Sequence, residues 1–346
     1  MVICSSGKYL ASLEKNLEMV PITKGKMIIT GSSGLVCSNL IDLLLYANKK
    51  KGCDFQLLVI GRDEESLRSR FGDDPSIKYK QIDLSQSQTL DIEEKYDYLI
   101  HGAAIADPIY YAKKPVETML INLNGTVVAL DYCRRNDCRL LFLSTFEVYG
   151  AVDNQPIKES DYGPIDIDEI RSSYSESKKC SEMLIRSYAE EFGVDAVIAR
   201  LSSIYGPTMK IDDNKAHSQF IMNGLRNQNI VMKSKGEQKR SYCYVFDVVS
   251  ALLFILSNGE CGKAYNVSDN SIVTIKGIAD IISELCNVEV IQELPNDLEK
   301  RGYSKGKDSV LDNSELKKLG WKPSYDPKNG FKDCIGIMRE LYANQL

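Results

Sequence analysis

The stretch Lys26-Met-Ile-Ile-Thr-Gly-Ser-Ser-Gly34 decides the fold of this chain. Its first five residues are mostly apolar and predict a short buried strand, and residues 36–48 repeat apolar side chains at helical spacing. The glycines at 31 and 34 permit a tight turn between the two and let the backbone approach a bound group at the helix N-terminus. A plain turn would use the same glycines. The strand-to-helix setting is therefore what makes this segment a candidate pyrophosphate-binding loop.

Strands and helices alternate beyond this loop. Short apolar segments predict further strands, and helical spacing predicts the segments between them. Strands are expected at 55–60, 78–82, 98–101, 140–143 and 196–200, and helices at 64–70, 115–136 and 174–192. Short buried strands joined through helices form a parallel sheet that is covered on both faces and has right-handed crossovers. The sequence therefore predicts the α/β class, with a Rossmann-type doubly wound parallel sheet.

Three parts are expected along the chain. Residues 1–25 form an N-terminal extension, with a helix over 7–20 that packs on the main domain. Residues 26–204 form the predicted NAD(P)-binding domain. Residues 205–346 form a smaller α+β part that binds the substrate, interleaves with the first domain and closes a cleft. Short helices are expected in it at 216–227, 247–257, 275–286 and 313–319.

The composition limits the classes of partner and the compartment. The chain has 346 residues and a net charge of -5, which gives no attraction for nucleic acid. Its ten cysteines lack paired spacing, so we expect reduced thiols and a cytoplasmic protein. With two histidines in total, no histidine-based metal site is expected. The sequence has neither a membrane-spanning apolar run nor, at Met1–Ser6, the pattern of a secretory signal, so neither a membrane span nor export is expected.

A second short motif, Tyr174-Ser-Glu-Ser-Lys178, lies in the helix predicted at 174–192. Residues four apart share one helix face. An ammonium beside a phenol favours the phenolate and would lower the pKa of Tyr174 from about 10 towards neutrality. Thr145 offers a hydroxyl that can relay a proton from a substrate alcohol while the hydride leaves for a nicotinamide ring. Because the spacing also occurs by chance, this interpretation depends on the dinucleotide loop.

The end of the second predicted strand bears on the choice of dinucleotide. An acid usually stands there to bind the adenosine ribose, but this chain has Gly61, Arg62 and Asp63. Arg62 and the missing acid favour the 2′-phosphate of NADP, whereas Asp63 can still reach a ribose. NAD is expected, with NADP as the alternative. The candidate cofactor-binding residues are Gly31, Ser33, Gly34, Leu35, Val36, Arg62, Asp83, Leu84, His101, Ala103, Ala104, Asn122, Ser144, Tyr174 and Lys178.

Several of these motifs together resemble the extended short-chain dehydrogenases/reductases, in the nucleotide-sugar epimerase/dehydratase group. The likeness covers nearly all of the chain after residue 25. The segments that match are Thr30–Gly34, Asn122–Thr126, Ser144–Gly150, Tyr174 with Lys178, Tyr205–Pro207 and Leu319–Pro323. Two further segments, His101–Tyr111 and Gln238–Val245, are most similar to those of UDP-glucuronate decarboxylases (UDP-xylose synthases).

The resemblance implies a bound dinucleotide that oxidises a nucleotide-linked sugar at C4, followed by a second step on the 4-keto-sugar. Dehydratases of this group carry an Asp-Glu pair after the threonine. The pair here is Phe146-Glu147, which resembles the decarboxylases and weakens a 4,6-dehydratase interpretation. Glu147 can hold a hydroxyl or act as a base, and Arg240 can bind a sugar carboxylate or a phosphate. Each can equally be a solvated surface charge.

The expected substrate end departs from the family pattern. Positions that usually hold asparagine, arginine or an aromatic residue are Ser203, Thr208, Gln219 and Lys233 here. The candidate substrate-binding residues are Tyr111, Ser203, Gln219, Lys233 and Arg240. The resemblance also implies a homodimer, formed through a four-helix bundle of the helices at 115–136 and 174–192.

Three hypotheses about function remain. The first is a nucleotide-sugar epimerase or decarboxylase with no net change in its cofactor. The second is a net oxidoreductase that acts on a sugar or alcohol without a nucleotide. The third, a non-catalytic dinucleotide-binding module, is least favoured because Tyr174, Lys178 and Thr145 are all present. With Glu147, these three residues make up the candidate catalytic set.

Overall fold

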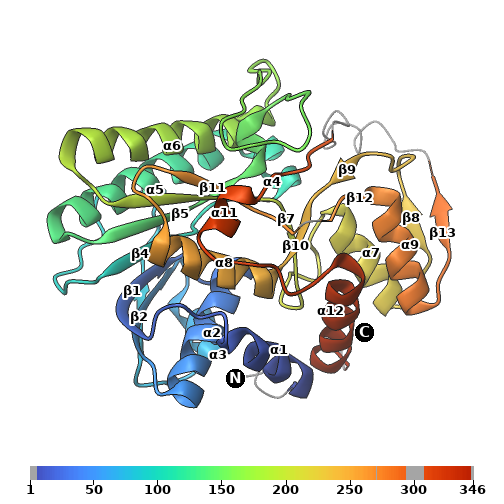
Figure 1. Cartoon of the computed structure of the whole chain (residues 1–346), viewed down its shortest axis with the longest axis horizontal. Coiled ribbons are helices and arrows are strands. Elements are labelled where there is room, and N and C mark those ends of the chain that lie inside the picture. Colours follow the sequence, from blue (N-terminus) through green and yellow to red (C-terminus); the bar gives the residue numbers. More distant parts are fainter. Residues whose placement is uncertain (1–5, 270, 294–307, 344–346) are drawn as a thin grey trace.

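The computed structural model describes residues 6–269, 271–293 and 308–343. Its centre is a seven-stranded sheet in the order β11-β6-β5-β4-β1-β2-β3 (Figure 1). Every neighbouring pair in this sheet is parallel. The strands are β1 (Lys24–Thr30), β2 (Asp54–Gly61), β3 (Ile77–Gln81), β4 (Tyr98–His101), β5 (Arg139–Thr145), β6 (Ala196–Leu201) and β11 (Ala264–Val267). The predicted doubly wound parallel sheet is confirmed.

The order of the strands reverses at β1. This strand pairs with β2 on one side and with β4 on the other, so the chain builds the sheet outward in both directions from it. In open parallel sheets, ligands bind beyond the carboxyl ends of the strands at such a reversal. Because β1 ends at Thr30 and leads into Gly31, the predicted loop lies at this crevice.

Helices cover both faces of the sheet (Figure 1). α5 (Pro115–Asn136) and α6 (Ser172–Phe192) lie side by side on one face, against β4, β5 and β6. α2 (Leu35–Lys51) and α8 (Val245–Asn258) pack together on the other face. α3 (Glu64–Phe71) contacts β2 and β3.

The two layers of helices account for the apolar run in β1. Met27 and Ile29 belong to the apolar core that includes α2 and α8, whereas Ile28 belongs to the core that includes α5 and α6. Successive side chains of a strand point to opposite faces. The part of a strand that is buried on both faces therefore carries consecutive apolar residues, and the run Met27–Ile29 is what made β1 recognisable in the sequence.

The first and last helices of the described chain are clasped together. α1 (Gly7–Leu17) starts after Ser6, whose hydroxyl accepts a hydrogen bond from Tyr9 N, and it ends before the predicted limit near residue 20. α12 (Pro327–Leu341), which was not predicted, contacts it. Ser6 Oγ donates to Glu340 Oε2 (2.7 Å), and Ser12 Oγ donates to Asp333 Oδ2 (2.7 Å).

The smaller part lies at one end of the molecule (right in Figure 1). It contains α7 (Ala216–Leu225), α9 (Ile275–Cys286) and α12, with β8 (Ile230–Met232) paired to β13 (Val290–Gln292). The remaining short elements are α4 (Pro108–Lys113), η2 (Phe146–Tyr149), β7 (Ser203–Tyr205), β9 (Lys239–Arg240), β10 (Tyr242–Tyr244), β12 (Val273–Thr274) and α11 (Ser314–Lys318). The helices expected at 216–227, 275–286 and 313–319 are α7, α9 and α11.

The two parts interleave. After α7 the chain returns to the sheet through α8, which contacts β5 and β6, and through β11, which pairs with β6. The sheet therefore includes residues beyond 204, and the boundary drawn there from the sequence does not coincide with its edge. The helix expected at 247–257 is α8, which belongs to a layer of the sheet rather than to the smaller part.

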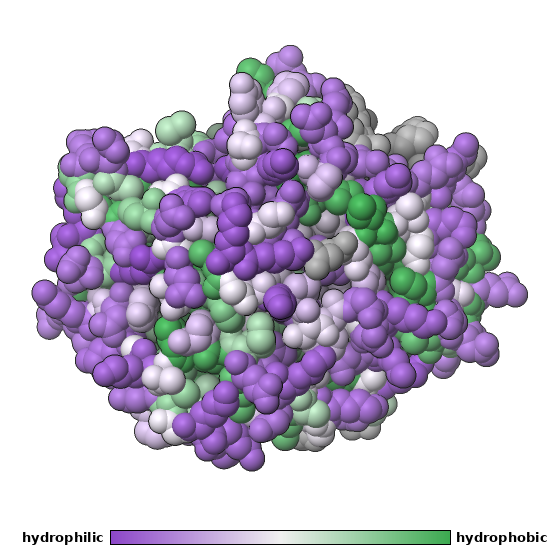
Figure 2. All heavy atoms as spheres, in the orientation of Figure 1, coloured by the Kyte–Doolittle hydropathy of each residue, from purple (hydrophilic) through white to green (hydrophobic). Residues whose placement is uncertain are grey.

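The surface face in Figure 2 is mostly hydrophilic, with apolar residues in small separated areas. Within residues 6–269, 271–293 and 308–343, no helix has the length and apolar character that crossing a membrane requires. The same residues contain no group of three or more His, Cys, Asp and Glu side chains placed to hold a metal ion.

We expect Tyr9→Phe to lower the free energy of unfolding by about 2 kcal/mol, measured by chemical denaturation. The buried Tyr9 hydroxyl joins α1 to α2, because it lies 2.6 Å from Asp42 Oδ2 and 2.9 Å from Asn39 Oδ1. Its removal takes the donor from the buried Asn39 Oδ1 and one of two donors from Asp42 Oδ2, which Arg70 also contacts, and loss of such a buried hydrogen bond costs about 1–3 kcal/mol. Tyr46→Phe is the control, since it removes an exposed hydrogen bond to Glu14 between the same helices. Equal losses in the two variants would contradict the role of burial.

Candidate active site

The four predicted catalytic residues come from two adjoining segments. β5 ends at Thr145, and the short helix η2 that follows it carries Glu147. Thr145 Oγ1 accepts from Glu147 N (3.3 Å) and so fixes the start of this turn. Tyr174 and Lys178 lie one turn apart on α6, which contacts both β5 and η2. The structure therefore brings all four residues to the carboxyl end of β5.

Lys178 is buried against β5. Its Nζ donates to Leu143 O (2.8 Å) and lies 4.4 Å from the centre of the Phe142 ring. Burial lowers the pKa of Lys178 to about 7, and the negative charge of Glu182 partly opposes this shift. A lysine with this pKa changes its charge near neutral pH.

Tyr174 does not have the pKa that its spacing from Lys178 suggested. Burial raises the pKa of Tyr174 above that of an ordinary tyrosine, Glu147 and Tyr111 raise it further, and the hydrogen bond with Thr145 lowers it. Lys178 is engaged with the carbonyl of the preceding strand and is not among the charges that act on the phenol. The prediction of a lowered pKa is therefore wrong for this arrangement, because spacing along a helix does not fix where Nζ points.

Polar side chains surround Tyr174 on the side of Glu147. Ser175 Oγ donates to Glu147 Oε2 (2.9 Å), and Arg171 Nη2 lies 3.6 Å from the same oxygen. Tyr111 from α4 stacks on Tyr174, with ring centroids 5.2 Å apart and 8° between the planes. Arg171 was not predicted. The signal that could have found it is its position one turn before Tyr174, at the start of the same helix.

A buried charge network lies one turn beyond Lys178. Glu182 is 2% exposed and accepts from Ser144 Oγ (2.6 Å) and from Nε and Nη2 of Arg200 (3.0 and 2.7 Å). Burial acts to raise the pKa of Glu182, but the hydrogen bonds and charge of Arg200 outweigh it, so the pKa is lowered. The ionised carboxylate thus joins α6, β5 and β6 directly behind Thr145.

The glycine loop has the geometry that a bound pyrophosphate requires. Gly31 has a φ of +68°, and a Cβ there would lie 2.5 Å from the backbone of Gly102. α2 begins at Leu35, and no side chain caps its first N–H groups at Gly34. Ser33 and Gly34 are exposed, and Leu35 and Val36 are half-buried. The loop and the N-terminus of α2 therefore fit the phosphates of a dinucleotide.

The third small position of the loop motif is Cys37, which is buried beside Gly102. A methyl group on Gly102 would overlap the sulfur of Cys37. The missing side chain of Gly102 thus provides the room that a glycine at position 37 would otherwise provide. Burial raises the pKa of Cys37 to about 12, so the thiol stays neutral.

The candidates at the adenosine end are partly engaged with the protein. Arg62 is exposed at the end of β2, and Asp63 caps α3 by accepting from Ser66 N (3.2 Å). Asp83 accepts from Ser85 N and Oγ (3.0 and 2.7 Å), while Leu84 is buried. Arg62 and Asp63 are thus both exposed, whereas Asp83 is half-buried.

The candidates after β4 and on α5 lie inside the protein. His101 Nδ1 is 2.8 Å from Thr30 Oγ1, and burial lowers the pKa of His101 to about 3, so its ring is neutral. Asn122 Nδ2 donates to Ser177 Oγ (2.8 Å). His101 Nε2 and Asn122 Oδ1 have no partner among the described residues. Ala103 N donates to Thr30 Oγ1 (3.3 Å), and Ala104 is half-buried next to it.

The other candidate substrate-binding residues come from elements after β6, whereas Tyr111 comes from α4. Ser203 lies in β7, Gln219 in α7 and Arg240 in β9, and Lys233 follows β8. Lys233 pairs with Glu293 (3.0 Å). The charge of Arg240 acts on the pKa values of His217 and Tyr242, which places it near β10.

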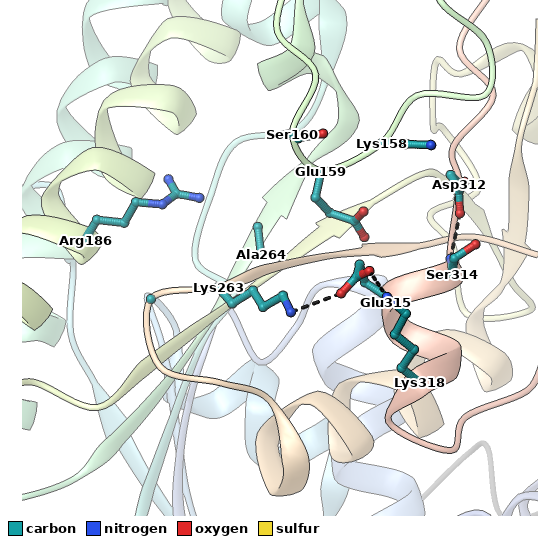
Figure 3. A pocket seen from close by; sticks show the side chains of 11 residues that line it. Lys158, Glu159, Ser160, Arg186, Lys263, Ala264, Asp312, Ser314, Glu315 and Lys318 are labelled. Carbon is teal, nitrogen blue, oxygen red and sulfur yellow. Dashed lines mark hydrogen bonds and ion pairs between the residues drawn. The ribbon is translucent and has the colours of Figure 1, made fainter.

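A separate hollow of about 570 Å³ lies beside β11 and α11 (Figure 3). Its charged lining consists of Lys158, Arg186, Lys263 and Lys318 with Glu159, Asp312 and Glu315. Lys263 and Lys318 both pair with Glu315, so much of this charge is balanced within the lining. None of the predicted site residues line this hollow, and the candidate active site remains the cluster around Tyr174.

The doubly wound sheet, the glycine loop at its reversal and the cluster of Tyr174, Lys178 and Thr145 are together the design of an extended short-chain dehydrogenase/reductase. The chain belongs to the NAD dependent epimerase/dehydratase family, whose profile matches residues 27–268. The resemblance inferred from the sequence motifs is confirmed. The protein is thus an enzyme of this family, and its cofactor is NAD.

Relatives and solved structures agree with this assignment. The chain is 30% identical to UDP-glucuronic acid decarboxylase 3 of Arabidopsis thaliana, over 93% of this chain and 90% of that protein. It is 27% identical to UDP-glucuronic acid decarboxylase 1 of Xenopus tropicalis, over 92% and 73%. A UDP-glucose 4-epimerase of Thermotoga maritima superposes with a TM-score of 0.77 at 22% identity, over 91% and 98%. The last comparison shows a shared fold.

We expect Glu182→Gln to move the alkaline limb of the pH profile of kcat/KM to lower pH. The carboxylate of Glu182 opposes the effect of burial on Lys178, so its loss lowers the pKa of Lys178 below about 7, and the ammonium is lost earlier as pH rises. Thermal unfolding of the variant checks that it is folded. Glu190→Gln, exposed on the same helix, should leave the profile unchanged. An unshifted limb in folded Glu182→Gln would show that Glu182 does not act on Lys178.

Proposed function

We propose that this enzyme removes the C6 carboxylate of UDP-glucuronic acid by way of a 4-keto-sugar. The observation that supports this most is Glu147, which is held beside Tyr174 by Ser175 (2.9 Å) and follows Phe146 rather than a second acid. Elimination of water needs an acid as well as a base, and Phe146 cannot supply one. The UDP-glucuronic acid decarboxylases among the relatives support the same substrate.

In the first step, Tyr174 accepts the proton of the sugar 4-hydroxyl, with Thr145 as the hydrogen-bonded relay. The loop from Gly31 to Gly34 would hold NAD, whose nicotinamide ring would supply the acceptor for the C4 hydride. Because burial raises the pKa of Tyr174, the phenol needs a positive charge close by to act as a base. Lys178, one turn along α6, supplies this charge when its Nζ turns from Leu143 O towards the phenol.

In the second step, the ketone at C4 activates the bond between C5 and C6. The carboxylate leaves as CO₂, and the electrons of that bond pass into an enolate. Tyr174, now protonated, donates a hydrogen bond to the enolate oxygen and so stabilises it. A proton is then added at C5. Glu147 is the titratable group beside Tyr174 that can exchange this proton. The C4 ketone then takes back the hydride that left in the first step, and Tyr174 returns its proton to the C4 oxygen, so that the dinucleotide would end in its starting state.

We expect Tyr174→Phe to lower the rate of CO₂ release from UDP-glucuronic acid by about 100- to 10,000-fold, the size of a lost acid–base group. The measurement is trapped CO₂ together with mass spectrometry of the nucleotide product. Tyr188→Phe is the matched control, because its hydroxyl lies on the same helix and bonds Asp131 (3.2 Å) away from the cluster. Normal turnover by Tyr174→Phe would contradict its role as the base.

The same assay separates the remaining alternatives. A product that keeps its carboxylate with a changed C4 configuration would indicate an epimerase. A stoichiometric rise in nicotinamide absorbance, when the assay is repeated with sugars and alcohols that carry no nucleotide, would indicate a net oxidoreductase, which the unusual Ser203 and Lys233 left open. A product that has lost water would indicate a 4,6-dehydratase.

We also propose that two copies of the chain associate through α5 and α6. These helices lie side by side and expose apolar side chains: Val116 is 70%, Leu120 45% and Met183 63% exposed. An apolar surface of this kind is typical of an association site. A second copy of the same helix pair, related by a two-fold axis, would cover it as a four-helix bundle.

We expect the wild type to be dimeric in light scattering after size-exclusion chromatography, and the double variant Leu120→Glu with Met183→Glu to be monomeric. Charges on both helices would have to be buried in the dimer, which is costly without partners. Ile272→Glu changes a side chain that is 60% exposed outside these helices, and it should remain dimeric. A wild-type monomer at micromolar concentration would contradict the proposal.

The state of the cysteines supports the expected cytoplasmic location. Those in the described residues are all free. A compartment that keeps thiols reduced suits a protein with buried, unpaired cysteines such as Cys37 and Cys334.

A further inference from the structure

Arg171 presents an incompletely paired guanidinium to the cluster around Tyr174. Its Nη2 donates to Tyr111 OH (3.2 Å) and lies 3.6 Å from Glu147 Oε2. The latter distance is too long for a hydrogen bond, so the ion pair with Glu147 is loose. The side chain is 21% exposed, and its Nε is buried without a hydrogen-bond partner among the described residues.

Arg200 is an example, in the same molecule, of a guanidinium whose hydrogen-bond donors are paired. Its Nε and Nη2 both donate to Glu182, and Nη1 donates to Glu159 O (2.9 Å). The edge formed by Nε and Nη2 is the one that grips a carboxylate with two parallel hydrogen bonds. On Arg171 this edge holds one neutral phenol and a distant carboxylate, and the charge of Glu169 also acts on the guanidinium. It therefore retains the capacity to bind another carboxylate.

The position of Arg171 identifies where that carboxylate would come from. The guanidinium lies within contact distance of Tyr111 and Glu147, and the rings of Tyr111 and Tyr174 are stacked. In a hexuronic acid, the carboxylate carbon C6 is bonded to C5, which is the ring atom next to C4. A sugar whose 4-hydroxyl reaches Tyr174 therefore carries its carboxylate close to the same cluster. Arg240, which from the sequence can bind a sugar carboxylate or a phosphate, lies on a different segment, in β9, which pairs with β12.

We propose that Arg171 is the specificity-determining residue of the site, and that its Nε and Nη2 bind the C6 carboxylate of a nucleotide-linked uronic acid. The proposal rests on the proposed function. When the carboxylate binds, Arg171 exchanges its loose contact with Glu147 for two short hydrogen bonds. Glu147 keeps the hydrogen bond from Ser175 and is freed from its cation at the time it is needed for proton exchange. A neutral hexose offers no such partner for the guanidinium.

The test is isothermal titration with UDP-glucuronate, UDP-glucose and UDP of the NAD-loaded protein, with every variant made in a Tyr174→Phe background so that the substrate is not converted during the titration. In Arg171→Gln, we expect the Kd for UDP-glucuronate to rise about 30-fold or more, as for a truncated buried charge pair. The Kd values for UDP-glucose and UDP should change less than about threefold. Arg171→Lys keeps the charge but loses the two-pronged geometry, and it should fall between the two. Arg226→Gln, exposed at the end of α7, is the control and should bind like the wild type.

The outcomes separate this inference from the proposed function. Equal weakening of UDP-glucuronate and UDP-glucose in folded Arg171→Gln and Arg171→Lys would make Arg171 a general structural residue and overturn the inference. An unchanged Kd for UDP-glucuronate would overturn it as well. If the wild type binds UDP-glucuronate more tightly than UDP-glucose through Arg171 but releases no CO₂, the inference stands and the proposed decarboxylation fails. A wild type that does not bind UDP-glucuronate overturns both.

Discussion

The pairing of Glu182 with Arg200 is the interaction on which the candidate active site depends. Glu182 comes from α6, Arg200 from β6, and Ser144, the third member, from β5. A buried carboxylate without such partners would cost several kcal/mol, so the three elements are stable only when they meet in this register. Thr145 follows Ser144 directly, and Lys178 and Tyr174 lie one and two turns before Glu182 on the same helix. By linking α6 to β5, the Glu182 carboxylate therefore helps to fix the positions of Tyr174 and Lys178 relative to Thr145.

Most of the sheet could be predicted from the sequence because its central strands carry short apolar runs that are buried on both faces, such as Met27–Ile29 in β1. α5 was predicted over the residues it occupies for a related reason, since its apolar spacing persists over many turns. β11 was missed because Ala264–Val267 is short and becomes a strand through pairing with β6, more than sixty residues earlier. α12 was missed although Asp326 caps it and Pro327 occupies its first turn, which are ordinary start signals. The sequence suggested that the two parts interleave but could not show which later segments join the sheet, because that depends on pairings between distant residues such as those of β11 with β6.

Within the site, the sequence was informative where the chemistry is local. Tyr174 and Lys178 are recognisable because a helix places residues four apart together. Arg171 could not be recognised from the sequence, because its role depends on contacts with Tyr111, which lies 60 residues away along the chain, and with Glu147. The pKa of Tyr174 was misjudged because it depends on the direction of Nζ, which Leu143 O determines. Cys37 and Gly102 are a further case that the sequence alone could not reveal. The cysteine side chain fits at position 37 only because residue 102 is a glycine.

The clasp between α1 and α12 has a consequence for how the molecule loses its structure. The smaller part already sends α8 and β11 into the layers of the sheet, so no single linker separates it from the rest. The contacts of Ser6 and Ser12 with α12 close a second connection, at the opposite end of the chain. We therefore expect no stable unfolding intermediate in which one part is folded and the other is not. The protein should unfold as one cooperative unit. Substitutions that weaken the contacts between α1 and α12 should therefore also destabilise the distant catalytic cluster.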